Sequence, residues 1–305
     1  MQSIESFLIR QYRLGSELSW HAHTAVDTVV CEEPLEIWLK ILTKPKQIAQ
    51  VRAAQVDSKP IVTIMRTPGD DINLVTGWLL TSGIVEKLSQ IVSMHHSGKN
   101  RLRNGESNQI RVTLSNEFDL NLDTLQRVEP VNSACGVCGQ QSIEDLLLRL
   151  EKQGRVNNNE HALLDLKAAV PLVLNLVEQQ PLFQLTGGNH GVGLFNQALQ
   201  VVDVREDVGR HNAFDKVIGA NSAELFTPAT GRDNLSLPII GAILSGRVGF
   251  EMIQKAAMAN LRYVFALGAP SSLAIELANE LDIGLVGFIK AERFNLYSGE
   301  QFFML

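Results

Sequence analysis

The sequence predicts a two-lobed α/β protein, and three observations support this fold class. The chain has 305 residues, which exceeds the usual size of one domain, about 100–200 residues. Hydrophobic residues make up 45% of it, enough for substantial cores. From residue 181 onward, apolar runs of strand length alternate with helical patterns. This alternation is typical of a layered α/β domain.

Composition excludes several classes of function. A formal charge of −6 provides no broad basic field, so we expect no nucleic-acid partner. No window approaches the roughly 20 apolar residues of a membrane span, so we expect no membrane partner. Three cysteines cannot build a disulfide framework, and the first residues lack the apolar run of a signal peptide. We therefore expect a cytoplasmic protein.

The N-terminal part, residues 1–130, is predicted to form a smaller α+β lobe. A helix is expected after residues 66–71, Arg-Thr-Pro-Gly-Asp-Asp, because proline and glycine form a turn there and the aspartates suit a helix start. Apolar residues then recur at helical spacing until Gly83. The polar residues 97–108 are expected to form an exposed hairpin tip. Strand patterns occupy residues 28–30, 36–41, 61–65 and 109–114.

Two of the three cysteines form a Cys-x-x-Cys pair, Cys135 and Cys138. A glycine follows each of them, and glycine permits unusual backbone angles and close approach. We therefore expect residues 131–141 to form a mobile, accessible loop whose thiols can meet a partner. A helix is predicted directly after this loop, and the dipole at its start would lower the pKa of a nearby thiol. This helix begins near Ser142, and its apolar face consists of Ile143, Leu146, Leu147 and Leu150.

Other interpretations of the cysteine pair remain open. A structural zinc site needs two more ligands, and no second Cys or His pair is present, so we expect no bound metal. A deaminase site needs a His-x-Glu partner, which none of the seven histidines provides. A thioredoxin-like dithiol oxidoreductase is the enzymatic alternative, although the motif does not begin a βαβ unit. We expect Cys31 to be a packed, inert thiol, and four histidines to lie at the surface, namely His21, His23, His95 and His96.

Residues 142–305 are predicted to form a C-terminal α/β lobe with a mixed sheet covered by helices. The first two strands are joined by few residues and should pair antiparallel, whereas strands separated by helices should be parallel. Residues 163–178 are interpreted as a link between the lobes. The predicted strands are residues 191–195, 199–204, 238–244, 263–267 and 284–289, and the predicted helices are residues 210–220, 250–260 and 271–280.

Polar and glycine-rich joints connect these elements, and most of them follow strands. Open α/β sheets build ligand sites at the carboxyl ends of their strands. Helix N-termini together with Arg and Ser suit phosphate or pyrophosphate. Neither a Walker loop nor a dinucleotide-binding glycine pattern is present, so an ordinary ATPase and a Rossmann dehydrogenase are not supported. The joints are residues 186–190, 205–212, 245–247, 268–272 and 290–295.

Structural alternatives exist for the polar residues of the joints. His190 and His211 could contact a ligand or act as acid or base groups, or they could make ordinary loop hydrogen bonds. The charged residues around the second joint could instead form a structural ion-pair network. This set comprises Asp203, Arg205, Glu206, Asp207 and Arg210.

Six ordered blocks stand out in the chain, namely RTPGDD (66–71), SACGVCG (133–139), TGGNH (186–190), REDVGRHNAFDKVIG (205–219), SGRVGFEM (245–252) and APSSLA (269–274). With these blocks, the chain resembles the formate dehydrogenase accessory sulfurtransferase family, FdhD/NarQ, from about residue 25 to the C-terminus. The resemblance implies a sulfur carrier that accepts persulfide sulfur from a cysteine desulfurase. It then passes the sulfur to the bis-molybdopterin guanine dinucleotide molybdenum cofactor, which formate dehydrogenase requires. The family also implies a cytidine deaminase-like three-layer core.

The resemblance also implies roles for individual residues. Cys135 matches the position that carries the persulfide, and Cys138 is then a helper or alternate carrier. Lys290 and Arg293 could meet phosphates of the cofactor. Small residues replace other small residues at three positions of the pattern, Gly191, Gly249 and Gly268. The predicted cofactor-binding residues are Thr186, Gly187, Gly188, His190, Arg205, Asp207, Arg210, His211, Ser245, Gly246, Arg247, Phe288, Ile289, Lys290, Ala291, Glu292 and Arg293.

The partners that the resemblance implies are a cysteine desulfurase, formate dehydrogenase apoprotein and a second copy of the chain in a homodimer. GDP is expected to mimic part of the cofactor. A chaperone that holds the cofactor without transferring sulfur is the functional alternative outside enzymology.

Overall fold

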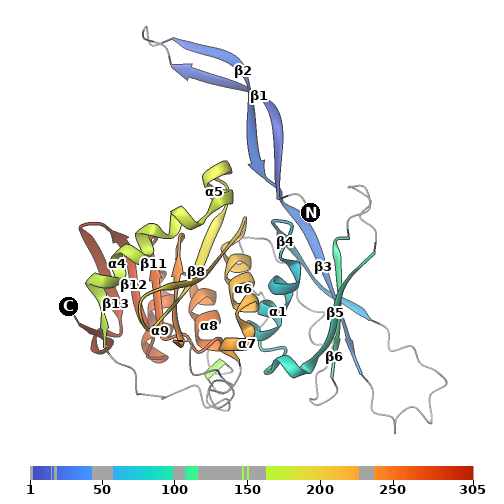
Figure 1. Ribbon diagram of the computed structural model, residues 1–305, viewed down its shortest axis with the longest axis vertical. Coiled ribbons are helices and arrows are strands. Elements are labelled where there is room, and N and C mark those ends of the chain that lie inside the picture. Colours follow the sequence, from blue (N-terminus) through green and yellow to red (C-terminus); the bar gives the residue numbers. More distant parts are fainter. Residues whose placement is uncertain are drawn as a thin grey trace, which may run out of the picture.

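The computed structural model describes residues 3–14, 16, 19–42, 58–98, 107–115, 146–147, 150, 163–226 and 237–304. Cys135 and Cys138 lie outside the described residues, as does most of the helix predicted after them. Figure 1 shows a body that contains a larger and a smaller sheet with helices between them, and a narrow ribbon that projects from it. No helix of the described part is long and apolar enough to cross a membrane.

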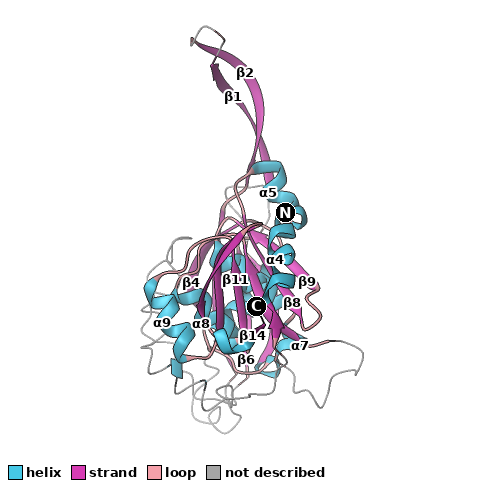
Figure 2. Cartoon of the chain, turned by 90° about the vertical axis from the view of Figure 1, so that its left-hand side faces the viewer, coloured by secondary structure: helices cyan, strands magenta, loops and turns pink. Residues whose placement is uncertain are grey.

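The ribbon consists of β1 (Ile4–Leu14) and β2 (Trp20–Val30), paired antiparallel along their whole length. It extends away from the body in both views (Figures 1 and 2). Only the end of β2 was predicted, because few side chains of the ribbon are buried and its polar residues hide the strand pattern. Directly opposite residues share a face, so one face of the ribbon gathers exposed apolar side chains, namely Leu8, Tyr12, Leu14, Trp20 and Val26.

The smaller sheet has four strands in the order β4-β3-β6-β5. Its central strand alternates buried and partly buried residues, and α1 packs on the buried face. The predicted strands and the predicted helix are confirmed here, whereas β5 was missed because most of its side chains are exposed. The elements are β3 (Glu33–Ile41), β4 (Lys59–Arg66), α1 (Asp71–Thr81), η2 (Leu88–Gln90), β5 (Ile91–Ser97) and β6 (Gln109–Leu114).

The larger sheet has six strands in the order β13-β12-β11-β10-β8-β9. The strand pairs β10-β11 and β11-β12 are parallel and the pair β8-β9 is antiparallel, as the sequence predicts. The pairs β8-β10 and β12-β13, which were not predicted, are also antiparallel. A short parallel pair lies apart from it, made of β7 (Leu164–Asp165) and β14 (Phe303–Met304). The six strands are β8 (His190–Asn196), β9 (Val201–Asp207), β10 (Ile239–Leu244), β11 (Tyr263–Ala266), β12 (Gly284–Lys290) and β13 (Arg293–Ser298).

Helices cover both faces of this sheet, which gives three layers. Residues of α6, α8 and α9 form one apolar core with one face, and α4 and η3 form another core with the opposite face. Leu146 and Leu150 of the predicted helix join the first core. The helices are α4 (Leu166–Leu174), η3 (Asn175–Gln179), α5 (Pro181–Thr186), α6 (Arg210–Ala220), α7 (Ser222–Leu225), α8 (Phe250–Met258), α9 (Ser272–Glu280) and η5 (Glu300–Phe302).

The interpretation of residues 163–178 as a link between lobes is wrong. These residues form β7, α4 and most of η3, which pack on the larger sheet. Their buried side chains recur at intervals of three or four residues, which is the spacing of a helix face. They include Leu166, Ala169, Leu172, Val173 and Leu176.

The two sheets are joined through a close contact between α1 and α6. A Cβ at Gly77 of α1 would overlap with the Asp215 carbonyl of α6, and a Cβ at Gly219 of α6 would overlap with the Asn73 carbonyl of α1. Backbones can approach this closely only where glycine removes the side chain. Figure 1 shows the two helices side by side between the sheets.

A buried ion pair lies beside this contact. Lys255 Nζ of α8 lies 2.6 and 2.8 Å from the two carboxylate oxygens of Asp215. Thr81 of α1 donates its hydroxyl to the same carboxylate over 2.8 Å. Because each partner satisfies the other, the pair is tolerated inside the apolar interface between three helices.

The α1–α6 contact predicts that Gly77→Ala destabilises the protein. Alanine is favoured over glycine in a helix by about 1 kcal/mol, so helix propensity alone would raise the stability. Overpacking costs ~1–3 kcal/mol, and the carbonyl it meets here belongs to a helix backbone that cannot rotate away. We expect a net decrease in the free energy of unfolding, measured by urea denaturation.

Gly249→Ala is the control for this prediction. Its added Cβ would meet only the end of the Glu251 side chain, at 3.3 Å. Gly249 is the N-cap of α8, where alanine is disfavoured, so we expect a loss of about 1 kcal/mol or less, smaller than that of Gly77→Ala. A Gly77→Ala variant as stable as the wild type would contradict the close approach of the two helices.

Candidate functional site

The polar joints predicted from the sequence meet at one edge of the six-stranded sheet. His190 at the start of β8 pairs with Asp207 at the end of β9. The end of β10 pairs with the start of β8 and with the end of β11, and β12 ends on the same side. We call this the carboxyl edge, and with strands about 4.8 Å apart it extends roughly 19 Å from β9 to β12.

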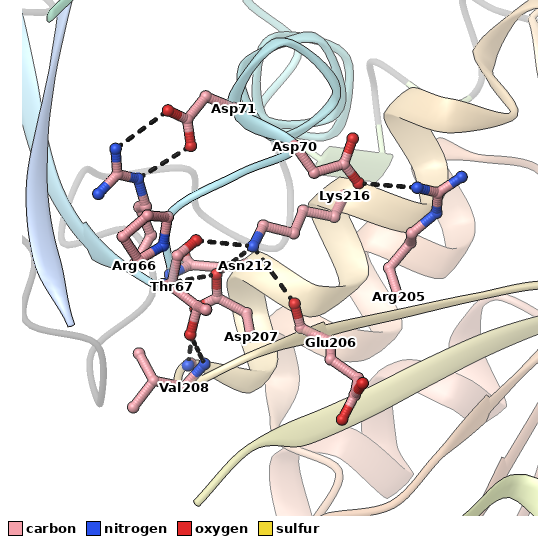
Figure 3. A network of polar contacts seen from close by, with 12 residues as sticks. Arg66, Thr67, Asp70, Asp71, Arg205, Glu206, Asp207, Val208, Asn212 and Lys216 are labelled. Atoms are coloured by element: carbon pink, nitrogen blue, oxygen red, sulfur yellow. Dashed lines mark hydrogen bonds and ion pairs between the residues drawn. The ribbon is translucent and has the colours of Figure 1, made fainter. Parts of the chain in front are cut away.

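Asp207 is fully buried at the carboxyl edge, and both of its carboxylate oxygens accept two contacts. Lys216 of α6 lies 2.7 Å from Oδ2, which also accepts the Thr67 N–H at 3.0 Å. Oδ1 accepts the Gly209 N–H and the Asn212 side chain, each at 2.9 Å. Figure 3 shows how Thr67 of the 66–71 turn and Asn212 and Lys216 of α6 converge on Asp207. The carboxylate thus fastens the turn to the larger sheet.

Further ion pairs fix the two sides of the same turn. Arg66 is buried and makes two hydrogen bonds to Asp71, of 2.9 and 3.0 Å. Asp70 at the start of α1 accepts Arg205 Nη1 at 3.1 Å (Figure 3). Arg205 also pairs with Asp203, at 3.0 Å. Asp70 has a left-handed backbone (φ 60°), which the tight turn requires.

These contacts favour the structural alternative for part of the second joint. Asp207 and Arg205 were predicted to bind a cofactor, but both form ion pairs with other residues of the chain. Glu206 likewise accepts the backbone N–H groups of Leu182 and Phe183, at 2.9 and 2.7 Å, and so holds the start of α5 in place. Arg205 and Glu206 nevertheless stay partly exposed.

Four other predicted residues form an electrostatic cluster at the carboxyl edge, namely His190, Arg210, His211 and Arg247. Burial is the main cause that lowers the pKa of His190, and the charges of Arg210, His211 and Arg247 lower it further against the opposing effect of Asp207. His190 is therefore neutral at neutral pH. Arg247 is exposed, so its guanidinium group can reach a ligand from solvent.

His211 is buried, and neither of its ring nitrogens has a hydrogen-bond partner among the described residues. Its Nε2 lies 3.6 Å from Glu251 in the first turn of α8, which is too long for a good hydrogen bond but within ion-pair distance when the ring is protonated. The His211 ring is the main cause that lowers the pKa of Glu251. Glu251 was not predicted, although it lies in a block that the sequence analysis singled out.

A cavity of about 290 Å³ opens beside this cluster. Gly187, Gly188, His190 and Ser245 line it, so four predicted residues share one space. The Ser245 hydroxyl accepts the Gly191 N–H at 2.9 Å, so it links the residue that follows β10 to the start of β8. Gly246 packs against His190, because a Cβ there would lie 3.1 Å from Nδ1. Thr186 ends α5 above the cavity and bonds to the Leu182 carbonyl at 2.7 Å.

The predicted segment 288–293 spans the end of β12, the two-residue turn after it and the first residue of β13, at the far end of the carboxyl edge. Phe288 has a left-handed backbone (φ 51°), an uncommon conformation for a large residue. Ile289 is buried in the core, so its side chain serves packing. The side chains of four residues project into solvent, namely Lys290, Ala291, Glu292 and Arg293.

The structure thus brings most predicted residues to one edge, but it adds several that the sequence analysis missed. Lys216 forms the ion pair that balances the charge of Asp207. Gln180 and Asn189 line the cavity. Asn189 and Lys216 lie inside quoted blocks, whereas nothing in the sequence marks Gln180. Cys31 is buried as predicted, and the four histidines expected at the surface are exposed. Within the described ranges, no group of His, Cys, Asp and Glu side chains could hold a metal ion.

The lowered pKa of His190 predicts a pH dependence of stability. The unfolded chain binds this proton with the ordinary pKa of 6.5, and the folded chain binds it less readily. Stability should therefore fall as the pH drops through 6.5, and His190→Gln should reduce this fall. Urea denaturation at pH 7.5, 6.5 and 5.5 measures it, with exposed His95→Gln as the control. Equal pH profiles for His190→Gln and the wild type would contradict the prediction.

Comparison with known proteins places this chain among a group of named relatives. It is 36% identical over 292 residues to sulfur carrier protein FdhD from Corynebacterium efficiens, covering 94% of this chain and 95% of that protein. It is 34% identical over 279 residues to sulfur carrier protein FdhD from Streptomyces avermitilis, covering 91% and 89%.

The fold is shared with a solved structure described as a formate dehydrogenase accessory protein from Desulfotalea psychrophila. The TM-score is 0.61 at 20% identity, and the match covers 98% of this chain and 99% of that one. This likeness shows the mixed α/β fold alone, and the cytidine deaminase-like description of the core stays a prediction. The model of the FdhD/NarQ family matches residues 50–303. The chain therefore belongs to the FdhD/NarQ family.

Proposed function

We propose that the chain is a sulfurtransferase that carries sulfur as a persulfide on Cys135, with Cys138 as helper or alternate carrier. The observation that carries this proposal is similarity over nearly the whole chain to proteins named sulfur carrier protein FdhD, in a chain that has a Cys-x-x-Cys pair. Both cysteines lie outside the described residues, so their chemistry is argued from the sequence.

The loading step is an exchange between a thiolate and a persulfide. The Cys135 thiolate attacks the outer sulfur of a cysteine desulfurase persulfide, and the desulfurase cysteine leaves as a thiolate. The outer sulfur now forms a new S–S bond to Cys135, and no net oxidation occurs. A thiolate is the nucleophile in this step, so a lowered pKa at Cys135 would raise the rate.

The substrate that receives the sulfur is proposed to be the bis-molybdopterin guanine dinucleotide molybdenum cofactor, bound as cargo at the carboxyl edge. This cargo carries pyrophosphates, and the edge offers matching charges. Arg247, Lys290 and Arg293 have exposed side chains there, and α6, α8 and α9 begin there with the positive ends of their dipoles. Formate dehydrogenase apoprotein is the proposed recipient of the finished cofactor, and a homodimer is the proposed assembly.

The loading step predicts one added sulfur atom on Cys135. The purified chain is incubated with a cysteine desulfurase and cysteine, and then analysed by intact and peptide mass spectrometry under non-reducing conditions. We expect the added sulfur on the peptide that contains Cys135, since this thiol accepts the sulfur directly.

Matched variants locate the carrier. Cys135→Ala should abolish the added sulfur, whereas Cys31→Ala, which removes a buried thiol elsewhere, should leave it unchanged. Cys138→Ala should leave sulfur on Cys135 if Cys138 is only a helper. Absence of added sulfur from both loop cysteines, with a desulfurase that is active on another acceptor, would overturn the carrier role and favour a chaperone that only holds the cofactor.

A further inference from the structure

The ribbon of β1 and β2 has one apolar face and one charged face. Residues directly opposite each other in the two strands share a face, and on the apolar face only Arg10 is charged. Five apolar side chains on it have exposed fractions between 51% and 76%, namely Leu8, Tyr12, Leu14, Trp20 and Val26. The charged face carries Glu5, Arg13, His21, His23 and Asp27. This division is the pattern of a sheet with one face buried and the other in water.

The base of the ribbon is fixed to the body, so the ribbon projects in a defined direction. The Ser3 hydroxyl donates to the Pro68 carbonyl at 3.0 Å, and the Cys31 N–H donates to the Ser3 carbonyl at 2.9 Å. A Cβ at Gly188, just after α5, would lie 3.0 Å from Val30 at the end of β2. With eleven residues in each strand, the ribbon reaches roughly 37 Å from there (Figures 1 and 2).

A projecting ribbon of this kind needs a partner. Two strands alone are marginally stable in water, and further strands or a packed surface are needed for stability. A contiguous exposed apolar patch marks an interaction site, and Trp and Tyr are the side chains that contribute most to such contacts. The apolar face therefore requires a second apolar surface of similar length and width.

We propose that the apolar face of the ribbon packs on the same face of a second copy of the chain. This inference rests on the proposed homodimer and goes beyond it by assigning the surface and the register. A two-fold axis lies between the two faces, crosses the strands at right angles and is level with the Gln11–His23 pair. The ribbons are then antiparallel and about 10 Å apart, with the two bodies at opposite ends.

This register gives every residue of the overlapping part a suitable partner. β1 lies over β1 of the second copy, and β2 over β2 of the second copy. The guanidinium group of Arg10 lies over the ring of Tyr12 of the second copy, which is a cation–π arrangement. The symmetry makes each contact twice. The other facing pairs are uncharged, namely Leu8 with Leu14, Val26 with Trp20 and Thr24 with Ala22.

The single charge on the apolar face selects this register among its neighbours. An axis level with residue 10 would set Arg10 against Arg10 of the second copy, and like charges in contact are repulsive. An axis level with residue 9 or residue 12 would set the guanidinium group against Leu8 or Leu14, which offer it no compensating interaction. Only the axis level with residue 11 gives Arg10 an aromatic ring.

The charges of the chain favour a second copy over a lipid surface. Anionic lipids attract clusters of basic residues, whereas this chain has a formal charge of −6 and the charged face of its ribbon carries both signs. Arg10 lies in the middle of the apolar face, where insertion into a bilayer would bury its charge at considerable cost. A second copy instead offers this charge the ring of Tyr12.

The oligomeric state of two double variants tests the surface. The ribbon faces alone would bury an area at the low end for specific interfaces, about 1,200–2,000 Å², so the wild type should be a dimer that dissociates on dilution. Sedimentation velocity over a concentration series measures its Kd. Leu8→Ser with Trp20→Ser should be a monomer, because two apolar anchors are lost.

Phe7→Ser with His21→Ser is the matched control, because it changes neighbouring residues on the charged face. This control should dimerise like the wild type. All four side chains are exposed, so both double variants should keep the circular dichroism spectrum of the wild type.

A charge exchange tests the register. Tyr12→Lys sets an ammonium group against Arg10 of the second copy twice in each dimer, so we expect the Kd to rise about ten-fold or more. Adding Arg10→Glu places a carboxylate opposite that ammonium group, so the Kd should return to within about three-fold of the wild type. This recovery requires that positions 10 and 12 of different copies face each other.

Three results would overturn the inference. Wild-type dimerisation by Leu8→Ser with Trp20→Ser, or no recovery on adding Arg10→Glu, would leave the proposed homodimer standing on another surface or register. A wild type that stays monomeric would remove the homodimer as well, and its flotation with phosphatidylglycerol vesicles would then identify lipid as the occupant. Sulfur loading of Cys135, measured by mass spectrometry on the same variants, tests the carrier proposal separately.

Discussion

The buried carboxylate of Asp207 is the interaction on which the arrangement of the carboxyl edge depends. It joins three parts of the chain, namely the end of β9, the start of α6 and the 66–71 turn that leads from the smaller sheet into α1. Removing one partner of a buried ion pair typically costs ~3–5 kcal/mol, because the remaining charge is left without compensation. Thr67, which Asp207 holds through its backbone N–H, donates a hydrogen bond to Asn189 in the wall of the cavity. The position of this wall therefore depends on contacts with both sheets.

A second constraint acts along the contact between α1 and α6. Gly77 and Gly219 let α1 and α6 meet backbone to backbone, and the Lys255–Asp215 pair closes the interface with α8. The contact and the Asp207 network together leave α1 little freedom relative to the larger sheet. This rigidity suits the proposed binding of a large cargo at the carboxyl edge, because ordering costs on binding are then small.

Much of the fold could be predicted from the sequence, and the failures have physical reasons. The bounds of α6 matched the prediction, since glycine precedes the helix, although residues 211–219 are buried all round and not along one apolar face. β1 and β5 were missed because their side chains are mostly exposed, and α4 was missed because an internal proline, Pro171, obscures its helical spacing. The joints were located because open sheets gather polar residues at strand ends. The partners Lys216 and Gln180 were not, because their contacts depend on chain segments far apart in sequence, and the roles of Cys135 and Cys138 stay predictions.

The central claim is that sulfur moves from this chain to the cofactor, and a single-turnover chase tests it most directly. The chain is loaded with ³⁴S persulfide, separated from the desulfurase and mixed with the molybdenum cofactor and formate dehydrogenase apoprotein. The account predicts that ³⁴S leaves Cys135 and appears in the cofactor in step with the gain of formate dehydrogenase activity. Full activation while ³⁴S remains on the chain, or equal activation by Cys135→Ala, would contradict it.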